Sequence, residues 1–438
     1  VPGRGDGEPP RFIRAGGGYP EPWTRDAAVN AWSAASMLEP EAARDTLLMV
    51  CERLPDGRRV IAQDNQWWDQ VIWIIAACQH ALATGDGTFG ELAFAIGRDS
   101  LAILDRDRYR PRYGLYVGGS FMQDGISGYP QPPNDPGIQS SFVLDYPLAR
   151  EIMCLSTNAL YVGALQALAS LADLTGAPSP GYRDRAARLA DAINDRLWIE
   201  GDGCYGYFLH GADGGQPGRV DRHQEAAGLG FALMFGVATG RRRDLVLANT
   251  HREPCGVVNV WPHFPERYSD ERPGRHNVLC WPMVMGIFGE AAARAGSVAV
   301  LDQILLDLQA LFAGSGDEFF ELYNARTGAP DGGWQCGRPW GSEPDQTWSA
   351  TALLRLVHLG LLGIRYSAAG MSFEPVVPSR FDGAVLSDLP YRQATLDISV
   401  TGHGRVLKAV RLDGEPASGP VHIPANLAGR HRVELEMG

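Results

Sequence analysis

Lysine is almost absent from this chain of 438 residues: Lys408 is the only one, and the net charge is −12. The nearest thing to a basic cluster is the arginine triplet at 241–243, a pattern typical of a solvated helix end. A surface this acidic argues against nucleic-acid and anionic-membrane partners, because both are polyanions. The chain also has no run of about 18 apolar residues, so no membrane span is expected.

Cysteine motifs are missing as well, since the seven cysteines are scattered and form no Cys-x-x-Cys pair. An odd, dispersed set predicts neither a disulfide framework nor a zinc site, although a single bridge such as Cys204–Cys255 stays open. No metal and no cofactor is expected. Residues 1–11, beginning VPGRGDGEPP, lack a charged-then-apolar signal pattern and are predicted to be a flexible lead-in. A cytoplasmic location and secretion after signal-peptide removal both stay open, as does the oligomeric state.

What the chain does have is a series of paired helices. Apolar residues recur every three to four positions, which predicts helices. The predicted helices span residues 26–37, 41–54, 67–84, 89–104, 156–175, 180–198, 223–239, 241–248, 277–295, 297–313 and 345–362, with a weaker candidate at 141–153. Within a pair the connections are short and polar, whereas the loops between pairs are long and rich in Gly, Pro, Asp and Trp.

This alternation predicts an all-α catalytic domain over 12–364, in which six helical hairpins close into an (α/α)6 toroid with every long loop on one face. The stretches 71–83 and 158–172 are apolar nearly all round and fit inner helices, while 182–198 is amphipathic and fits the outer ring. From 365 to 438 apolar and polar residues alternate between Gly, Pro and Asp-Gly turns, which predicts a small antiparallel, β-sandwich-like domain.

The long loops place tryptophan and tyrosine beside acids, amides and arginine. Aromatic rings stack on the C–H faces of sugars while carboxylates and amides bind hydroxyl groups, so the expected partner is a carbohydrate. Core packing remains the alternative for each aromatic side chain taken alone. The loop residues that motivate this interpretation are Trp23, Arg25, Asp26, Asp64, Asn65, Gln66, Trp67, Trp68, Asp69, Trp334, Gln335, Trp340, Glu343 and Asp345.

Glycoside hydrolysis needs two carboxyl groups, one acting as acid and one as base or nucleophile. Glu321 is the first candidate, because Phe319, Phe320 and Tyr323 surround it in FFELYN and can partly desolvate it; a solvent-facing strand carboxylate is the alternative. Asp124, in a long loop, is the second, although Asp-Gly is also a plain turn dipeptide.

Other polar residues compete for roles in the site. Asp69 ranks next to Asp124 for the acid, while Asp26 and Asp64 have the positions of helix caps. Arg25 and Arg222 can each bind an acidic substrate or form a structural ion pair. His223 and Gln224 open a predicted inner helix, where either a substrate contact or a satisfied structural histidine is possible.

Several motifs resemble those of the six-hairpin glycosidases, namely trehalases of family 37, processing-glucosidase relatives of family 63 and mannosylglycerate hydrolases. FFELYNARTG is similar to their base segment FxEYYNxxTG, and NALYVGALQALASLA from Asn158 is similar to the helix that follows their acid loop. GGYPEPWTRDAAVNAW resembles their W-x-RD substrate segment, NVLCWPMVMGIF their aromatic–proline segment, and PDQTWSATALLRLVHLGLLG their last inner helix. The likeness covers roughly 12–362, and the C-terminal piece looks more like the β caps of rhamnosidases and disaccharide phosphorylases.

The resemblance implies an inverting mechanism with Glu321 as base and Asp124 as acid. It carries Trp23, Arg25 and Asp26 over as sugar contacts and points to Trp281. The trehalase context ESGxD is missing around Asp124, where Met122 and Gln123 stand instead, and this leaves the substrate open. The predicted substrate-binding residues are therefore Trp23, Arg25, Asp26, Asn65, Gln66, Trp68, Asp69, Gln224, Trp281, Tyr323, Trp334, Gln335 and Trp340.

The leading hypothesis is an exo-acting glycosidase that cleaves an α-linked oligosaccharide or small glycoside. A disaccharide phosphorylase on the same barrel is one alternative, and a glycan-binding protein without activity is another. The sugar and its linkage stay open.

Overall fold

The computed structural model describes residues 11–438 apart from 62–69, 123–136, 139, 141–144, 180, 212–215 and 265–267. The α-helices are α1 (Thr24–Asn30), α2 (Ser36–Leu38), α3 (Pro40–Met49), α4 (Val71–Thr84), α5 (Gly87–Arg108), α6 (Leu155–Thr175), α7 (Tyr182–Leu197), α8 (Ala226–Met234), α9 (Gly240–Asn249), α10 (Pro282–Arg294), α11 (Val298–Gly314) and α12 (Thr347–Arg355). Two π-helical segments, η1 (Ala31–Ala35) and η5 (Leu356–Leu361), continue α1 and α12, and two 3-10 turns are η4 (Pro147–Arg150) and η6 (Ser379–Phe381).

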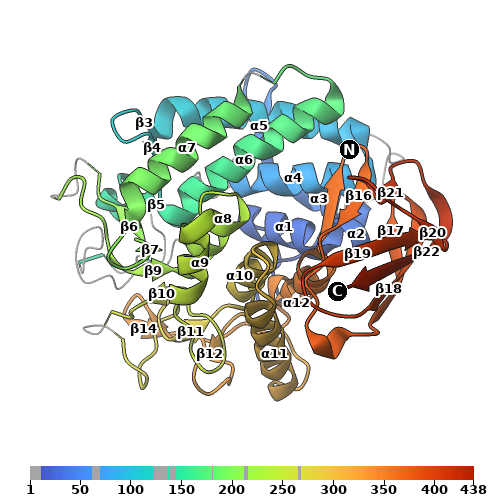
Figure 1. The fold of residues 1–438 in the computed structure, drawn as a ribbon. Helices are drawn as coiled ribbons and strands as arrows, with labels where there is room; N and C mark the ends of the chain where they lie inside the picture. The colour runs from blue at the N-terminus through green and yellow to red at the C-terminus, as the bar shows by residue number, and fades with distance from the viewer. Residues whose placement is uncertain are drawn as a thin grey trace.

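Most of the strands are short and join the loops between helices. These are β1 (Cys51–Arg53), β2 (Arg59–Ile61), β3 (Tyr109–Arg110), β4 (Leu115–Tyr116), β5 (Met153–Cys154), β6 (Trp198–Ile199), β7 (Cys204–Tyr205), β8 (Phe208–Leu209), β9 (Gln224–Glu225), β10 (Val260–Trp261), β11 (Leu279–Cys280), β12 (Tyr323–Asn324), β13 (Trp334–Gln335) and β14 (Arg338–Pro339). Figure 1 shows β5, β6, β7, β9, β10, β11, β12 and β14 on the left and lower side of the molecule, away from the C-terminal strands on the right.

The predicted helix pairs are confirmed, and the tight turn between α4 and α5 shows why they form. Gly85 ends α4 in the left-handed conformation, with φ of 75°, and its N–H bonds to the carbonyl of Ala81. Asp86 then begins α5 by accepting the N–H of Phe89 at 2.9 Å. The candidate helix at 141–153 is wrong where the structure describes it, because that part holds only η4 and β5.

Burial separates two kinds of helix, as their sequences predict. Helix α4 is buried on nearly all sides, because it packs against α1, α5 and α6. Helix α7 buries only one stripe, formed by Tyr182, Ala186, Leu189, Ile193 and Leu197. Contacts run from α1 to α4, α6, α8, α10 and α12 in turn, and α12 also contacts α1.

The C-terminal region is rich in strands, as predicted (Figure 1). Three strands, β15 (Ile364–Ser367), β16 (Gly370–Phe373) and β21 (Ile423–Pro424), form one sheet, and the other runs in the order β17 (Val385–Tyr391), β18 (Gln393–Thr401), β22 (Ala428–Met437), β19 (Leu407–Leu412) and β20 (Glu415–Pro416). The prediction of purely antiparallel pairing is wrong for β18 and β22, which are parallel. Residues 402–427 supply the connection that a parallel pair needs.

Two further findings concern thiols and membranes. All seven cysteines are free, so the bridge left open for Cys204 and Cys255 is not formed. Within the described ranges, no helix combines the length and the apolarity needed to cross a bilayer.

Candidate functional site

Glu321 lies in an irregular segment that precedes β12, and its side chain is buried with 4% exposure. Neighbouring loop residues fix its backbone. The N–H of Glu321 donates to the carbonyl of Glu343 at 2.8 Å, the hydroxyl of Ser342 bonds both the N–H and the carbonyl of Leu322 at 2.8 Å, and Ser349 donates to the carbonyl of Phe320 at 2.8 Å. The segment before α12 therefore holds the backbone that carries Glu321.

Arg275 is the charged partner of Glu321. Its Nη2 donates to Oε2 of the carboxylate at 2.7 Å, and Arg275 is itself only 5% exposed. Such a buried, charge-assisted contact favours the ionised form of the carboxyl group. The sequence prediction missed Arg275, because it stands 46 residues before Glu321 in a stretch, ERPGRHN, that is typical of a polar loop.

Two of the predicted tryptophans surround this arginine. The guanidinium carbon lies 5.3 Å from the ring centre of Trp281 and 5.7 Å from that of Trp340. The indole N–H of Trp281 donates to the carbonyl of Arg275 at 2.8 Å, and that of Trp340 donates to the carbonyl of Gln335 at 3.0 Å. The structure thus brings Glu321, Trp281, Gln335 and Trp340 together around Arg275.

Trp334 belongs to the same group through its backbone. Its N–H donates to Pro273 at 2.7 Å and its carbonyl accepts the N–H of Arg275 at 3.2 Å. The guanidinium of Arg272, which is exposed, stands 4.2 Å from the Trp334 ring centre. Gly333 permits this close approach, because its φ is 64° and a Cβ there would lie 2.9 Å from the carbonyl of Pro273.

An N-terminal loop closes on the same cluster from another side. The N–H of Gly17 bonds to the carbonyl of Pro344 at 3.2 Å. Gly18 lies against the carboxylate end of the Glu343 side chain, which a Cβ at this position would meet. Burial raises the pKa of the neighbouring Tyr19, the charge of Glu321 raises it further, and Arg275 opposes that effect. Tyr19 therefore stays protonated close to the ion pair.

Arg25 connects this cluster to the loop that leads toward Asp124. Its Nη1 donates to the carbonyl of Phe121 at 2.7 Å, and its guanidinium carbon lies 5.6 Å from the ring centre of Trp348. Trp348 is buried, and its ring centre is 5.9 Å from that of Trp281. Arg25 thus contacts the chain three residues before Asp124 and, through two tryptophans, reaches the surroundings of Arg275.

Other predicted residues take different positions. Asp26 is buried in the first turn of α1 and acts electrostatically on Tyr19, whereas Trp23 is the N-cap residue of that helix and half-buried. Asp124, Asn65, Gln66, Trp68 and Asp69 lie outside the described residues, as do Asp64 and Trp67.

Tyr323 and Gln224 are engaged by protein groups. The hydroxyl of Tyr323 accepts the N–H of Phe320 at 3.0 Å and donates to the carbonyl of Glu318 at 3.1 Å. The amide of Gln224 donates to Asn249 at 2.8 Å and accepts the N–H of His251 at 2.9 Å. These contacts hold each side chain in place, and the prediction that both also contact a sugar stays a prediction.

Two of the open assignments resolve to structural contacts. The guanidinium of Arg222, which is exposed, pairs with Asp202. His223 contacts the carboxylate of Asp221 at 2.9 Å through Nδ1, as expected of a satisfied structural histidine.

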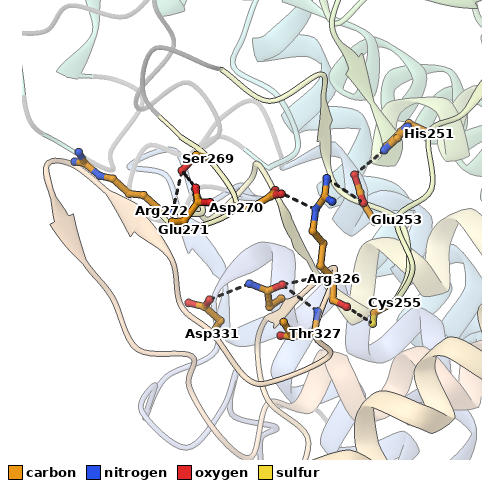
Figure 2. Close-up of polar contacts among 11 residues, drawn as sticks. His251, Glu253, Cys255, Ser269, Asp270, Glu271, Arg272, Arg326, Thr327 and Asp331 are labelled. Atoms are coloured by element: carbon orange, nitrogen blue, oxygen red, sulfur yellow. Dashed lines mark hydrogen bonds and ion pairs between the residues drawn. The ribbon is translucent and has the colours of Figure 1, made fainter.

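The turn that follows Glu321 is fastened to neighbouring loops, as Figure 2 shows. Arg326 pairs with Asp270 at 3.0 Å and with Glu253 at 3.7 Å. Asn324 accepts the N–H of Arg326 at 3.0 Å and donates to Asp331 at 3.4 Å. We call these contacts the outer network. Its side chains belong to exposed or half-buried residues, and they stabilise the turn.

A second carboxyl group that the sequence prediction missed is Glu225. It is fully buried at the start of α8 and accepts the N–H of Ser156 at 3.2 Å and its hydroxyl at 2.7 Å. Burial raises the pKa of Glu225 to about 8, although the two contacts with Ser156 oppose the shift. An acid directly before the uncharged run AAGLGFALM is the signal that could have identified it. In the described part of the chain, no three His, Cys, Asp or Glu side chains are placed to hold a metal ion.

Comparisons with known proteins agree on the fold. A mannosylglycerate hydrolase of family GH63 from Thermus thermophilus, solved with Tris and D-glycerate, is 18% identical with a TM-score of 0.59, over 79% of this chain and 96% of its own. A sialidase is 16% identical with a TM-score of 0.65, over 90% of this chain and 36% of its own. A GH78 rhamnosidase of a Bacillus species is 18% identical with a TM-score of 0.51, over 84% and 34%. No curated protein matches the chain.

The family assignment comes from the sequence of the helical part. Residues 19–349 match the model of the mannosylglycerate hydrolase MGH1-like glycoside hydrolase domain. This match covers more than half of the chain and includes Glu321, Arg275 and the tryptophans around them. The chain belongs to the MGH1-like glycoside hydrolase family, and it is a glycoside hydrolase.

Proposed function

We propose that the chain is an inverting, exo-acting hydrolase of an α-linked oligosaccharide or small glycoside, with Glu321 as general base. The observation that carries the proposal is the buried Glu321 carboxylate, held at 2.7 Å by Arg275 beside Trp281 and Trp340. A general base must be ionised and fixed in direction before it can activate water. A buried carboxylate paired with arginine among aromatic rings meets both conditions.

The proposed acid is Asp124, with Asp69 as the second candidate. Support comes from Phe121, whose carbonyl accepts from Arg25 and whose N–H donates to Ser156 at 2.8 Å, because these bonds fix the chain shortly before Asp124. In an inverting enzyme the two carboxyl groups stand roughly 6.5–9.5 Å apart to leave room for the attacking water. Asp124 would protonate the departing oxygen while Glu321 takes a proton from that water.

The proposed architecture is an (α/α)6 toroid over 12–364 with a separate β domain over 365–438. The closed cycle of contacts through α1, α4, α6, α8, α10 and α12 supports an inner ring of six helices. The long loops would then share one face, where sugar hydroxyl groups and ring faces bind to Trp23, Arg25, Asp26, Gln224, Trp281, Tyr323, Trp334, Gln335 and Trp340. Asn65, Gln66, Trp68 and Asp69 are proposed to complete this face.

The test is a hydrolysis screen. Because the Thermus thermophilus neighbour was solved with D-glycerate and with glucose, the panel should include glycosyl glycerates beside α-linked disaccharides and longer oligosaccharides. Proton NMR of the first product anomer reads the stereochemistry, and we expect inversion. Release of product only with added phosphate would indicate a phosphorylase, and binding without any turnover would indicate a lectin-like protein.

Two variants test the catalytic pair on the substrate so identified. Glu321→Gln and Asp124→Asn should each lower kcat by about 100-fold or more, because a positioned acid or base contributes roughly 10²- to 10⁴-fold. Near-normal activity of Asp124→Asn would transfer the acid role to Asp69, and near-normal activity of Glu321→Gln would refute the proposed base.

A further inference from the structure

We propose that Arg275 is the positioning residue of the reaction: it holds the Glu321 carboxylate ionised and in one orientation, and it couples this carboxylate to the tryptophan hairpin formed by β13 and β14. The inference rests on the proposed role of Glu321 and adds a residue that acts through it.

Both members of the Arg275–Glu321 pair are buried. Arg275 is 5% exposed and Glu321 is 4% exposed, and their side chains meet at 2.7 Å. An arginine side chain keeps its charge in a protein, so a carboxylate that touches it in a buried place is held in the ionised form. The contact therefore keeps Glu321 competent to accept a proton.

The guanidinium of Arg275 is itself held in place by backbone carbonyl groups and aromatic rings. Its Nη1 donates to the carbonyl of Gly332 at 3.2 Å and to that of Gly341 at 3.3 Å. The rings of Trp281 and Trp340 lie within cation–π distance, at 5.3 and 5.7 Å. These groups fix the planar fork in direction, so the fork can orient the carboxylate.

Arg275 also contacts both ends of the hairpin formed by β13 and β14. Gly332 must be glycine, because a Cβ there would lie 2.2 Å from the carbonyl of Trp340. This close approach lets the ends of the hairpin, at Gly332 and Gly341, bring their carbonyl groups to one guanidinium. A displacement of the hairpin is thereby transmitted to the direction of the Glu321 carboxylate.

Other charged groups lie in the surroundings of the pair. Tyr19 of the N-terminal loop is subject to the charges of both members of the pair, and Glu343 from the loop before α12 and Asp26 from α1 act on it as well. Asp26 and Glu343 are both carboxylates, which disfavour a further negative charge close by. Arg275 offsets them. Without it, Glu321 would become protonated at a higher pH.

The experiment compares Arg275→Met, which removes the charge, and Arg275→Lys, which keeps the charge but loses the fork. Arg326→Met is the matched control, because Arg326 is likewise an arginine paired with carboxylates, those of Asp270 and Glu253, yet lies in the outer network of Figure 2. The readouts are kcat, KM and the pH profile of kcat/KM on the substrate that the wild type hydrolyses, with circular dichroism and thermal unfolding as checks of folding.

We expect Arg275→Met to lower kcat at least about 10-fold and less than Glu321→Gln does, because the base is kept but misaligned. KM should change less than kcat. The acid limb of the pH profile should move to higher pH, since the base must be ionised and the charge that favours ionisation is gone. Arg275→Lys should restore the acid limb but only part of kcat, and Arg326→Met should leave both unchanged.

An acid limb at the wild-type pH in Arg275→Met, with only a lower melting temperature, would show a structural role and overturn the proposal. Should that variant fail to fold, Arg275→Lys decides, because a wild-type kcat in it would refute the orienting role. Loss of activity in Glu321→Gln together with an unchanged profile in Arg275→Met refutes this inference alone. Wild-type activity in Glu321→Gln refutes the proposed function, and the inference falls with it.

Discussion

The chain buries the pair Arg355–Glu290 as well as the pair Arg275–Glu321, and their surroundings differ. Glu290 lies on α10 and Arg355 on α12, where their side chains make a 2.6 Å charge contact. Arg294, one turn along α10, adds a contact of 2.7 Å, and the guanidinium of Arg355 lies 4.0 Å from the Trp32 ring centre. Burial opposes ionisation of Glu290, but Arg355 and Arg294 outweigh it and lower the pKa of this carboxyl group.

The Arg275–Glu321 pair has no such regular frame, because both residues lie in irregular segments. Helices satisfy their own backbone hydrogen bonds, whereas loops need partners from elsewhere. Around the second pair, Ser342 supplies such a partner to the N–H of Leu322, and the guanidinium of Arg275 supplies one to the carbonyl groups of Gly332 and Gly341. The comparison indicates that an ion pair between helices stabilises their packing, whereas an ion pair between loops holds a side chain in one orientation. A catalytic side chain must be held in this way.

The largest expected effect separates the two glutamates by function. Glu321→Gln should lower kcat by about 10²- to 10⁴-fold, since its amide cannot accept a proton from water. The protein should stay folded at some cost in stability, because Arg275 loses its charged partner but the amide oxygen can still accept from it and the backbone contacts of residue 321 are untouched. Steady-state kinetics and circular dichroism measure the two quantities, and loss of the folded signal would give Glu321 the same role as Glu290.

The reverse pattern is expected for Glu290→Gln. Removing one member of a buried pair leaves the other charge uncompensated and costs about 3–5 kcal/mol of folding free energy. Because Glu290 contacts Arg355 and Arg294 rather than any residue of the candidate site, kcat per folded molecule should remain close to that of the wild type. Urea unfolding measures the loss. A wild-type midpoint would mean that the helix pair contributes little.

The sequence allowed the helical elements to be predicted, because apolar spacing depends only on local order. Helix α7 follows from it in both extent and burial, and helix α4 follows from it in burial. The C-terminal strands were predictable too, but the parallel pairing of β18 with β22 was not, since alternation of residues carries no information about strand direction.

Within the candidate site, Glu321 was identifiable from its aromatic neighbours but Arg275 was not. The two meet only because the tertiary fold brings together segments far apart in the chain. Tyr323 shows a different limit. Its hydroxyl bonds to the backbone of Phe320 and Glu318, and these contacts depend on the irregular backbone before β12, which residue spacing in the sequence does not indicate.

Glu225 is a third kind of buried carboxyl group, because its contacts in the described part of the chain include no cationic side chain. For this residue we expect a pH-dependent change in stability of intermediate size. Its pKa of about 8 when folded lies above the ordinary value of 4.5, so the folded state holds the proton more tightly than the unfolded chain. Stability should therefore be greatest below pH 4.5 for this group and fall by up to about 1.4 kcal/mol per pH unit until about pH 8. Glu225→Gln should remove that slope, which chemical denaturation at several pH values measures. An equal slope in both proteins would assign it to other groups.

The smallest effect is expected at Arg326, which also pairs with carboxylates but whose own side chain is half exposed to water. Its side chain is 46% exposed and pairs with Asp270 at 3.0 Å and Glu253 at 3.7 Å. Water and salt screen such contacts, so Arg326→Met should cost less than about 1 kcal/mol of folding free energy and leave the pH profile unchanged. Thermal unfolding at low and high salt measures this, with the difference between variant and wild type shrinking as salt rises. A loss as large as that of Glu290→Gln would mean that the turn after Glu321 depends on its outer network. In that case the burial of an arginine would not predict how much folding free energy is lost when it is removed.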